Sequence, residues 1–343
     1  MRYYCLALIA AAAFGLGIQP GLARDAVKVG INGYISDTPL YIAQEKGFFE
    51  EQGIAVTLID LTTGGQMSAP LASGQLDVGA GSLSVGLYNS AIRGINTKIV
   101  ADKSRISPRS TYLQLIIRKD LAGTVKKLGD LKGLKIGING RWGVQASTIN
   151  EFLKAGNLKF EDVEIVWNMS NPQQVVALKN GAIDAALTAE PAATAAFDQG
   201  LAAPFGQVAD VYPDQEYSVL VYSENFISQR RDVAQRFMVA YIKGLRVYND
   251  AQVDGFFKGP GANEVIDIIA KHTIIKDKAL LARVGANGVD PDGKLNVNGM
   301  KKDLAFFKQH KVLEGDIAVE ALIDESFLKS AVDKLGPYRA PMR

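Results

Sequence analysis

Segments that favour strands and segments that favour helices alternate along this chain, and they do so in two successive series. In the first series, the β-branched runs at 27–31 and 54–61 are each followed by a small polar turn and then by helical spacing of apolar residues. The second series begins at 112–118 and repeats the same order. Because consecutive parallel strands need a helical crossover, this order predicts an α/β fold with mostly parallel sheets covered by helices.

The same patterns give the remaining elements. Further strands are expected at 76–79, 98–101, 134–138, 163–167 and 183–187, with extended segments at 204–211 and 217–222. Helices are expected at 39–51, 83–93, 144–155, 172–180 and 191–199, and then in a nearly all-helical tail at 231–249, 262–271, 278–283, 300–309 and 325–335. We expect this tail to wrap around one lobe, and short extended crossings near 104–114 and 210–220 to join the two units.

Residues 1–23 have the features of a secretory signal peptide. An uncharged apolar run at 6–18 precedes Gly21-Leu22-Ala23, a small-residue cleavage site. The apolar run is short for a membrane span, which needs about 20 residues. We therefore predict cleavage after Ala23 and a periplasmic location, and the only cysteine, Cys5, would leave with the signal peptide.

The composition argues against several functional classes. The formal net charge of the 343-residue chain is +2, which gives no support to nucleic-acid binding. The two histidines, His272 and His310, are assigned to solvated helix faces, so no transition-metal site is expected. Neither a G-x-S-x-G elbow nor a P-loop is present. We predict a protein that is not an enzyme and that needs no cofactor, with acid–base work by a carboxylate pair as the open alternative.

Small polar turns follow several predicted strands and open the next helices. In an open α/β sheet, ligands bind beyond the carboxyl ends of the strands, where helix N-termini suit an anion. Two units that carry such turns predict a cleft between hinged lobes. The turns contain the candidate ligand-binding residues Tyr34, Ser36, Asp37, Thr38, Gly64, Gly65, Ser82, Ser84, Arg141 and Trp142.

The candidates of the first two turns have alternative roles. Residues 34–37 are expected either to contact the ligand or to serve only as turn and capping residues. Thr38 is in addition a natural N-cap for a helix that begins with Pro39. Gly64 and Gly65 would let the backbone approach the ligand, or would form an ordinary turn.

The remaining candidates also have two roles each. Ser82 and Ser84 would donate hydroxyl groups to an anionic group, or would cap the following helix. Arg141 would hold a carboxylate or sulfonate in bidentate fashion, and Trp142 would cover an apolar part of the ligand. The alternative for this pair is a solvated arginine and a tryptophan that packs between the lobes.

Five short motifs lie in these two series: TPLYIA at 38–43, EKGFF at 45–49, LASGQLDVG at 71–79, DLKGLKIG at 130–137 and LKNGAIDA at 178–185. With them the chain resembles the periplasmic substrate-binding proteins of ABC transporters, most closely the nitrate, sulfonate and taurine group, which is similar to thiamine-pyrimidine binders. The resemblance implies a type II periplasmic-binding-protein fold, in which two α/β lobes enclose a cleft and two hinge crossings join them.

The resemblance also implies boundaries and one more site residue. Lobe one would comprise 24–110 together with 220–343, and lobe two would comprise 111–219. Glu190 matches the acidic residue that precedes a proline in the family and would contact the ligand, with capping of the helix at Pro191 as the alternative.

These features lead to one function hypothesis and three alternatives. The chain is expected to be a monomeric receptor that captures a small organic anion, of the sulfonate or carboxylate type, and delivers it to an ABC permease in the inner membrane. The first alternative is a binder of a pyrimidine, a thiamine precursor or another neutral heteroaromatic solute. The second is an enzyme similar to thiamine-pyrimidine synthases, disfavoured because neither histidine lies on a cleft turn. The third is a sensor that presents its ligand to another periplasmic domain.

Overall fold

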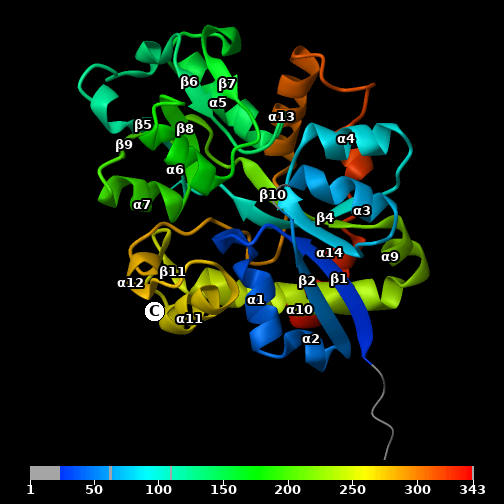
Figure 1. Ribbon diagram of the computed structural model, residues 1–343. Coiled ribbons are helices and arrows are strands. Elements are labelled where there is room, and N and C mark those ends of the chain that lie inside the picture. Colours follow the sequence, from blue (N-terminus) through cyan, green and yellow to red (C-terminus); the bar gives the residue numbers. More distant parts are fainter. Residues whose placement is uncertain (1–23, 62–63, 109, 342–343) are drawn as a thin grey trace, which may run out of the picture.

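The computed structural model describes residues 24–61, 64–108 and 110–341, and it arranges them as two β-sheets with helices packed against them (Figure 1). The predicted signal peptide, residues 1–23, lies outside the described residues. Among the helices of the described part, none has the length and apolar character that crossing a membrane requires.

The first sheet contains five strands in the spatial order β2 (Ile54–Asp60), β1 (Asp25–Ile31), β3 (Val78–Ser82), β10 (Glu216–Tyr222) and β4 (Lys98–Arg105). β1 runs parallel to β2 and β3, whereas β10 runs antiparallel to β3 and β4. The second sheet has the order β7 (Glu164–Val166), β6 (Lys135–Gly137), β8 (Ala185–Ala189), β5 (Leu113–Arg118) and β9 (Ala202–Gln207). β6 is parallel to β7 and β8, and β5 is antiparallel to β8 and β9.

The sheets are thus mixed. Four of the five strands in each sheet run in one direction, as expected of mostly parallel sheets, and only β10 and β5 run opposite to the others. β10 and β5 are the strands that enter a sheet directly from the other unit. They need no helical crossover, so they can run opposite to their neighbours.

Helices cover these sheets and form most of the C-terminal part. The helices are α1 (Thr38–Glu45), α2 (Phe48–Glu51), α3 (Ser68–Ala72), α4 (Val85–Ile92), α5 (Val144–Ala155), α6 (Asn171–Lys179), α7 (Ala192–Asp198), α8 (Val208–Val211), α9 (Glu224–Gln229), α10 (Arg231–Asp250), α11 (Ala262–His272), α12 (Lys278–Leu281), α13 (Val297–Gln309) and α14 (Ser326–Leu335). A two-stranded ribbon, β11 (Gln252–Val253) with β12 (Phe256–Phe257), interrupts the tail.

Several predicted boundaries differ from the structure for local reasons. The helix expected at 39–51 is divided into α1 and α2 because Gly47 adopts a left-handed conformation with φ of 71°. The extended segment expected at 204–211 ends with β9 and continues as α8. The strand expected at 76–79 begins only at Val78.

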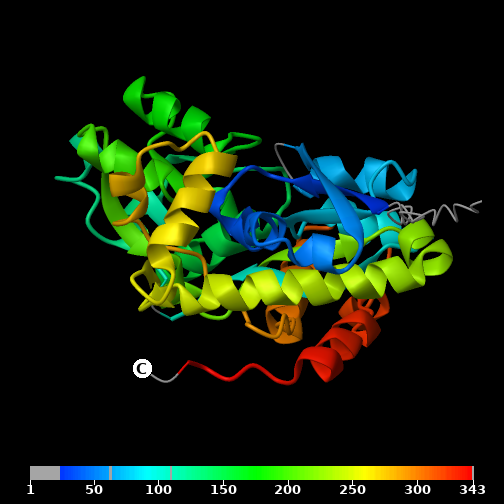
Figure 2. The same cartoon turned by 90° about the horizontal axis from the view of Figure 1, so that it is seen from below.

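The longest helix, α10, packs across the first sheet's lobe against α1 and α14 (Figure 2). Its buried side chains recur about every fourth residue, as in Val233, Phe237, Tyr241 and Leu245, so one apolar face is directed to the core. Gly244 lies where α1 crosses this helix, and a Cβ atom there would come within 2.2 Å of the Pro39 carbonyl oxygen. The glycine therefore permits the close approach of the two helices.

The chain passes from one sheet to the other at two crossings. The first joins β4 to β5, and the second, at 208–215, includes α8 and joins β9 to β10. β10 belongs to the first sheet from Glu216 onward, which is before the predicted lobe boundary at 220.

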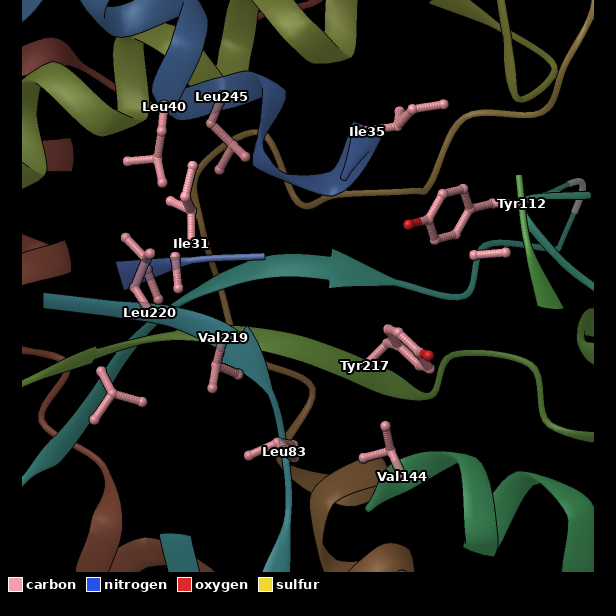
Figure 3. Packing of buried hydrophobic residues seen from close by; sticks show 14 of the residues in the cluster. Ile31, Ile35, Leu40, Leu83, Tyr112, Val144, Tyr217, Val219, Leu220 and Leu245 are labelled. Atoms are coloured by element: carbon pink, nitrogen blue, oxygen red, sulfur yellow. The ribbon is translucent and has the colours of Figure 1, made fainter. Parts of the chain in front are cut away.

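The helical tail contacts both sheets' lobes, not one as expected. α10 packs on α1, whereas α13 packs on α5 beside the second sheet (Figure 1). Buried side chains from both lobes also meet between the sheets, where Leu83, Tyr112, Val144 and Tyr217 belong to one continuous apolar cluster (Figure 3).

Candidate functional site

A cavity of about 290 Å³ lies between the two sheets, beyond the carboxyl ends of β1, β3 and β6. The first sheet and the turns that follow its strands contribute Asn32, Tyr34, Ser36, Gly65, Gln66, Ser82, Leu83, Ser84, Gly86, Tyr217 and Ser218. The second sheet, its turns and the first crossing contribute Tyr112, Asn139, Gly140, Arg141, Gly143, Val144, Gln145, Asn168, Asn171 and Ala189. The volume is close to the lower end of the range for small-molecule pockets.

The two halves of the cavity are built alike. β1 and β6 are each followed within two residues by an Asn-Gly pair, Asn32-Gly33 and Asn139-Gly140, in which the glycine has a φ of 73° or 75°. Each turn thereby directs the chain into a helix and places the asparagine at the cavity wall. The Asn139 amide donates to the Tyr34 hydroxyl at 3.4 Å, which links the two halves.

A buried ion pair between Asp37 and Lys103 stabilises the turn that follows β1. The Asp37 carboxylate accepts hydrogen bonds from the backbone amides of Asn32 (3.1 Å) and Tyr34 (3.0 Å). Its other oxygen lies 2.6 Å from the ammonium group of Lys103 on β4, and both side chains are at most 1% exposed. Lys103 also donates to the Ser36 hydroxyl at 3.2 Å. The pair therefore positions Tyr34 and Ser36 at the cavity without lining it.

The N-termini of α4 and α5 meet at the cavity, one from each lobe. The first amide of α4, at Val85, donates to the Trp142 carbonyl (3.0 Å), and the first amide of α5, at Val144, donates to the Leu83 carbonyl (3.2 Å). The second amides, of Gly86 and Gln145, have no hydrogen-bond partner among the described residues, and both residues line the cavity. Two helix N-termini, each with an unpaired amide and a partial positive charge, therefore adjoin the same space.

Arg141 is a charged residue of the cavity wall, and it is exposed at the rim. No other described lining residue is charged, and the remaining polar groups are amides and hydroxyls. Burial raises the pKa of the tyrosines in the wall, Tyr34, Tyr112 and Tyr217, so their phenol groups stay neutral near pH 7.

The structure brings six of the predicted residues to the cavity: Tyr34, Ser36, Gly65, Ser82, Ser84 and Arg141. Ser84 is the N-cap residue of α4, but its side chain accepts no capping hydrogen bond. Gly64 begins the 3₁₀ turn Gly64–Met67 next to Gly65. Whether these residues contact a ligand stays a prediction.

The other predicted residues lie outside the wall. Asp37 is buried in its ion pair with Lys103. Thr38 is the first residue of α1 and not its N-cap, and its hydroxyl donates to the Ile35 carbonyl at 2.6 Å. Glu190 is also buried, and its carboxylate accepts from the Thr194 amide at 3.0 Å in the first turn of α7, as the capping alternative predicted. Burial raises the pKa of Glu190.

Trp142 packs into an aromatic cluster away from the cavity. Its ring centroid lies 5.0 Å from that of Trp167, 5.8 Å from Phe160, 6.1 Å from Phe306 and 5.4 Å from His310. The backbone of Trp142 has a φ of 51°, a conformation that is unfavourable for a residue with a Cβ atom and directs the side chain to this cluster. The structure therefore shows Trp142 in a packing role.

The prediction that both histidines lie on solvated helix faces is wrong. His272 ends α11 and His310 directly follows α13, and each ring packs against aromatic residues of neighbouring elements. The His272 ring stacks on Tyr41 with centroids 4.8 Å apart, and its Nε2 lies 2.6 Å from a carboxylate oxygen of Glu45. His310 lies in the aromatic cluster, 4.5 Å from the Phe306 ring. Neither histidine lines the cavity, and the described residues contain no cluster of three His, Cys, Asp or Glu side chains that could hold a metal ion.

Sequence reasoning missed most of the amide and tyrosine groups of the wall. The sequence does show the two Asn-Gly pairs as turns. One pair follows β1 and the other follows β6, and this repetition could have identified Asn32 and Asn139 as candidate site residues. Tyr112, Tyr217 and Ser218 come from the crossings and from the returning strand β10. No local pattern marks such residues, because long-range strand pairing brings them to the site.

A second buried carboxyl group, Asp303 of α13, fastens the tail to the second lobe. It accepts hydrogen bonds from the hydroxyls of Ser147 and Tyr212 and from the Gln215 amide. Burial raises the pKa of Asp303 from its ordinary value of 3.8 to about 7. The folded protein therefore keeps this proton between about pH 4 and pH 7 while the unfolded chain loses it, so stability falls as the pH rises through this window.

Substitution of Asp303 by asparagine should remove this pH dependence. Because the asparagine oxygen can accept the same hydrogen bonds, we expect Asp303→Asn to raise the free energy of unfolding at pH 8 by about 2–4 kcal/mol and to change it little at pH 4. Urea unfolding at both pH values measures this difference. The control is Asp316→Asn, whose side chain is 95% exposed. An equal change at pH 4 and pH 8 would show that Asp303 is ionised at neither pH or at both.

A family model described as NMT1/THI5 like matches residues 35–252. The chain is 28% identical over 152 residues to 4-amino-5-hydroxymethyl-2-methylpyrimidine phosphate synthase of Aspergillus parasiticus, a match that covers 44% of this chain and 42% of that protein. It is 22% identical over 243 residues to the nitrate/nitrite binding protein NrtA of Nostoc sp., which covers 65% of this chain and 54% of that protein. The chain thus spans about half the length of these relatives.

Solved structures share the fold. The periplasmic nitrate-binding protein NrtA from Synechocystis has a TM-score of 0.75 at 14% identity, over 91% of this chain and 89% of that one. The ligand-binding component of an ABC-type import system from Staphylococcus aureus has a TM-score of 0.73 at 19% identity, over 90% and 99%. The periplasmic aliphatic sulphonate binding protein SsuA from Escherichia coli has a TM-score of 0.67 at 16% identity, over 88% and 92%. The predicted fold, two α/β lobes around a cleft, is confirmed.

Proposed function

This chain belongs to the NMT1/THI5-like family, and on that premise we propose that it is a solute receptor that holds a small organic anion between its two lobes. The family relation and the structural neighbours, several of which are binding components of import systems, support a binding function. The anionic character of the ligand is our own inference from the cavity.

The observation that carries this inference is the convergence of two helix N-termini on one cavity, in whose wall the described part of the chain places no carboxylate. The free amides of Gly86 and Gln145 would each donate to an anionic oxygen, and Arg141 would add the only full positive charge among the described lining residues. The hydroxyls of Ser82 and Ser84 are additional donors within the same wall. A sulfonate or carboxylate group matches this set of donors.

The receptor would act outside the cytoplasm and deliver its ligand to a permease. The predicted signal peptide at 1–23 and the periplasmic location of two structural neighbours support this proposal. The closed form of the two lobes would present the surface that the permease recognises, and a ligand would stabilise that form further only through higher affinity for it. We propose a monomer as the functional unit.

A neutral heteroaromatic solute, such as a pyrimidine, is the second candidate ligand. The match to a pyrimidine phosphate synthase favours it, as do the three neutral tyrosine rings in the wall. Because that relative is a synthase, an enzyme is the alternative of another functional class. We propose a receptor without catalytic activity because the wall offers neither His272 nor His310 as a general acid or base.

Removal of the Arg141 charge separates the two candidate ligands. We expect Arg141→Gln to weaken binding of an anion about tenfold, because a charge-assisted hydrogen bond at an exposed rim is worth roughly 1–1.5 kcal/mol, and to leave binding of a neutral pyrimidine unchanged. Isothermal titration calorimetry with nitrate, alkanesulfonates, aromatic carboxylates and pyrimidines measures both. Lys179→Gln, which removes an equal charge from the exposed end of α6, is the control. Tight binding of pyrimidines with no binding of anions would refute the anion proposal.

A further inference from the structure

We infer that a direct backbone bridge between the lobes, formed by Leu83–Val85 and Trp142–Val144 and here called the clasp, holds this protein closed before any ligand binds. The inference concerns closure itself, and it relies on the proposed function only where ligand affinity is measured. Ser84 and Gly143 form the central antiparallel pair of the clasp.

The donors of the clasp are backbone amides that make no hydrogen bond within their own helices. The amides of Val85 and Val144 occupy the first position of α4 and α5, where a helix offers no internal acceptor. Each donates to a carbonyl of the opposite lobe, at 3.0 Å and 3.2 Å respectively. Closure therefore satisfies two otherwise unpaired amides at no cost to the helices, and opening returns both to water.

Apolar side chains shield these hydrogen bonds. Leu83 is fully buried and Val144 is 1% exposed. In Figure 3, Val144 stands at the beginning of α5 below Tyr217, and Leu83 lies beside it on the chain from β3. The Leu83 amide in turn donates to the Tyr217 carbonyl of β10 at 3.3 Å, so the clasp continues into the first sheet. A hydrogen bond in such surroundings competes less with water than an exposed one.

The second lobe presents its acceptor in a fixed orientation. The carbonyl that receives the Val85 amide belongs to Trp142, whose left-handed backbone is maintained by its aromatic cluster. Two members of this cluster, Phe306 and His310, come from the end of α13 and from the residue after it. The C-terminal part of the chain thereby supports one half of the clasp.

The clasp has a consequence for ligand binding. The unpaired amides of Gly86 and Gln145 follow the two clasp donors directly, so the clasp also sets the distance between them. A ligand would then meet a largely preformed site, and loss of the clasp would lower its apparent affinity in proportion to the closed fraction.

Proline substitutions can remove the clasp donors and leave the helices intact. Proline is favoured at the first helical position, and the residue before it must be extended. Ser84 (φ −152°, ψ 159°) and Gly143 (φ −99°, ψ −177°) already are extended, so Val85→Pro and Val144→Pro suit the local backbone. Glu224→Pro, at the exposed first position of α9 after the extended Ser223, is the matched control.

Spin-label distance measurements on the ligand-free protein test the inference. The labels are placed at Ala69→Cys of α3 and Val176→Cys of α6, both exposed, in a Cys5→Ala background that contains no other cysteine. We expect one dominant short distance in the parent and in Glu224→Pro. In each clasp variant the ratio of closed to open molecules should fall about fivefold, the effect of losing one hydrogen bond. Distance distributions equal to that of the parent in both clasp variants would overturn the inference.

Hydrogen exchange of the parent protein is a second test that needs no variant. Amides at the first helical position normally exchange quickly, but the clasp predicts slow exchange at Val85 and Val144 in the absence of ligand. The neighbouring amides of Gly86 and Gln145 should exchange quickly until a ligand is added. Fast exchange at all four would contradict the clasp. Slow exchange at Val85 and Val144 with no response to any solute would leave the clasp standing and count against the proposed ligand site.

Discussion

Replacement of Gly86 by phenylalanine is expected to abolish ligand binding while the protein remains folded. Gly86 lines the cavity at the free amide of α4, and a Cβ atom built there has only the hydroxyl oxygens of Ser68 and Ser84 nearby, both at 3.6 Å. The backbone of Gly86 is not left-handed, so a side chain is tolerated. The added ring would enter a cavity of about 290 Å³ and displace the ligand.

We expect the dissociation constant of the ligand to rise at least about 100-fold, which corresponds to roughly 2.7 kcal/mol. Calorimetric titration measures this change, and thermal unfolding without ligand checks that the fold is retained. The matched control is Gly123→Phe, because Gly123 also has ordinary backbone angles, has open space around its Cβ position and lies outside the cavity. Binding by Gly86→Phe with parental affinity would place the ligand elsewhere.

Lys103→Met is expected to cause the largest loss of stability. Lys103 and Asp37 are both buried, and the substitution leaves the Asp37 carboxylate without its counter-charge. Removing one partner of a buried ion pair typically costs about 3–5 kcal/mol. Because Asp37 accepts the amides of Asn32 and Tyr34, the turn at the cavity should also lose its order.

The double variant Asp37→Asn with Lys103→Met separates charge from packing. An asparagine can still accept from the turn amides but carries no charge, so the double variant should regain most of the stability that Lys103→Met loses. Urea unfolding of both variants at pH 7 gives the two free energies. A loss of less than 1 kcal/mol in Lys103→Met, or an equal loss in the double variant, would contradict the role assigned to the pair.

Local sequence patterns predicted the order of elements well. The β-branched runs correspond to β1, β2 and β5, and the turns after β1, β3 and β6 do reach one cavity. These features depend on residues that are neighbours in the chain, where strand propensity and turn chemistry act directly.

Features that depend on distant pairing were not predictable in this way. Nothing in the sequence around Glu216 shows that β10 joins the first sheet in an antiparallel direction. Asp37 has the same local signature as a ligand-binding turn residue, and only the position of Lys103 on β4 makes it a buried partner. Trp142 likewise has the local sequence context of a cleft residue. Its packing against Phe306 and His310 depends on the position of α13, which is distant in the sequence.

We propose above all that the cavity between the lobes binds a small organic anion. The most direct measurement is thermal unfolding of protein that has been unfolded and refolded to remove any carried ligand, with nitrate, alkanesulfonates, taurine, aromatic carboxylates and pyrimidines added in turn. A solute at about 1,000 times its dissociation constant adds about 4 kcal/mol, which raises the midpoint by several degrees. We predict such a rise for at least one anion in the parent protein and in Gly123→Phe, and none in Gly86→Phe. A rise with pyrimidines alone, or a rise that Gly86→Phe retains, would contradict the claim.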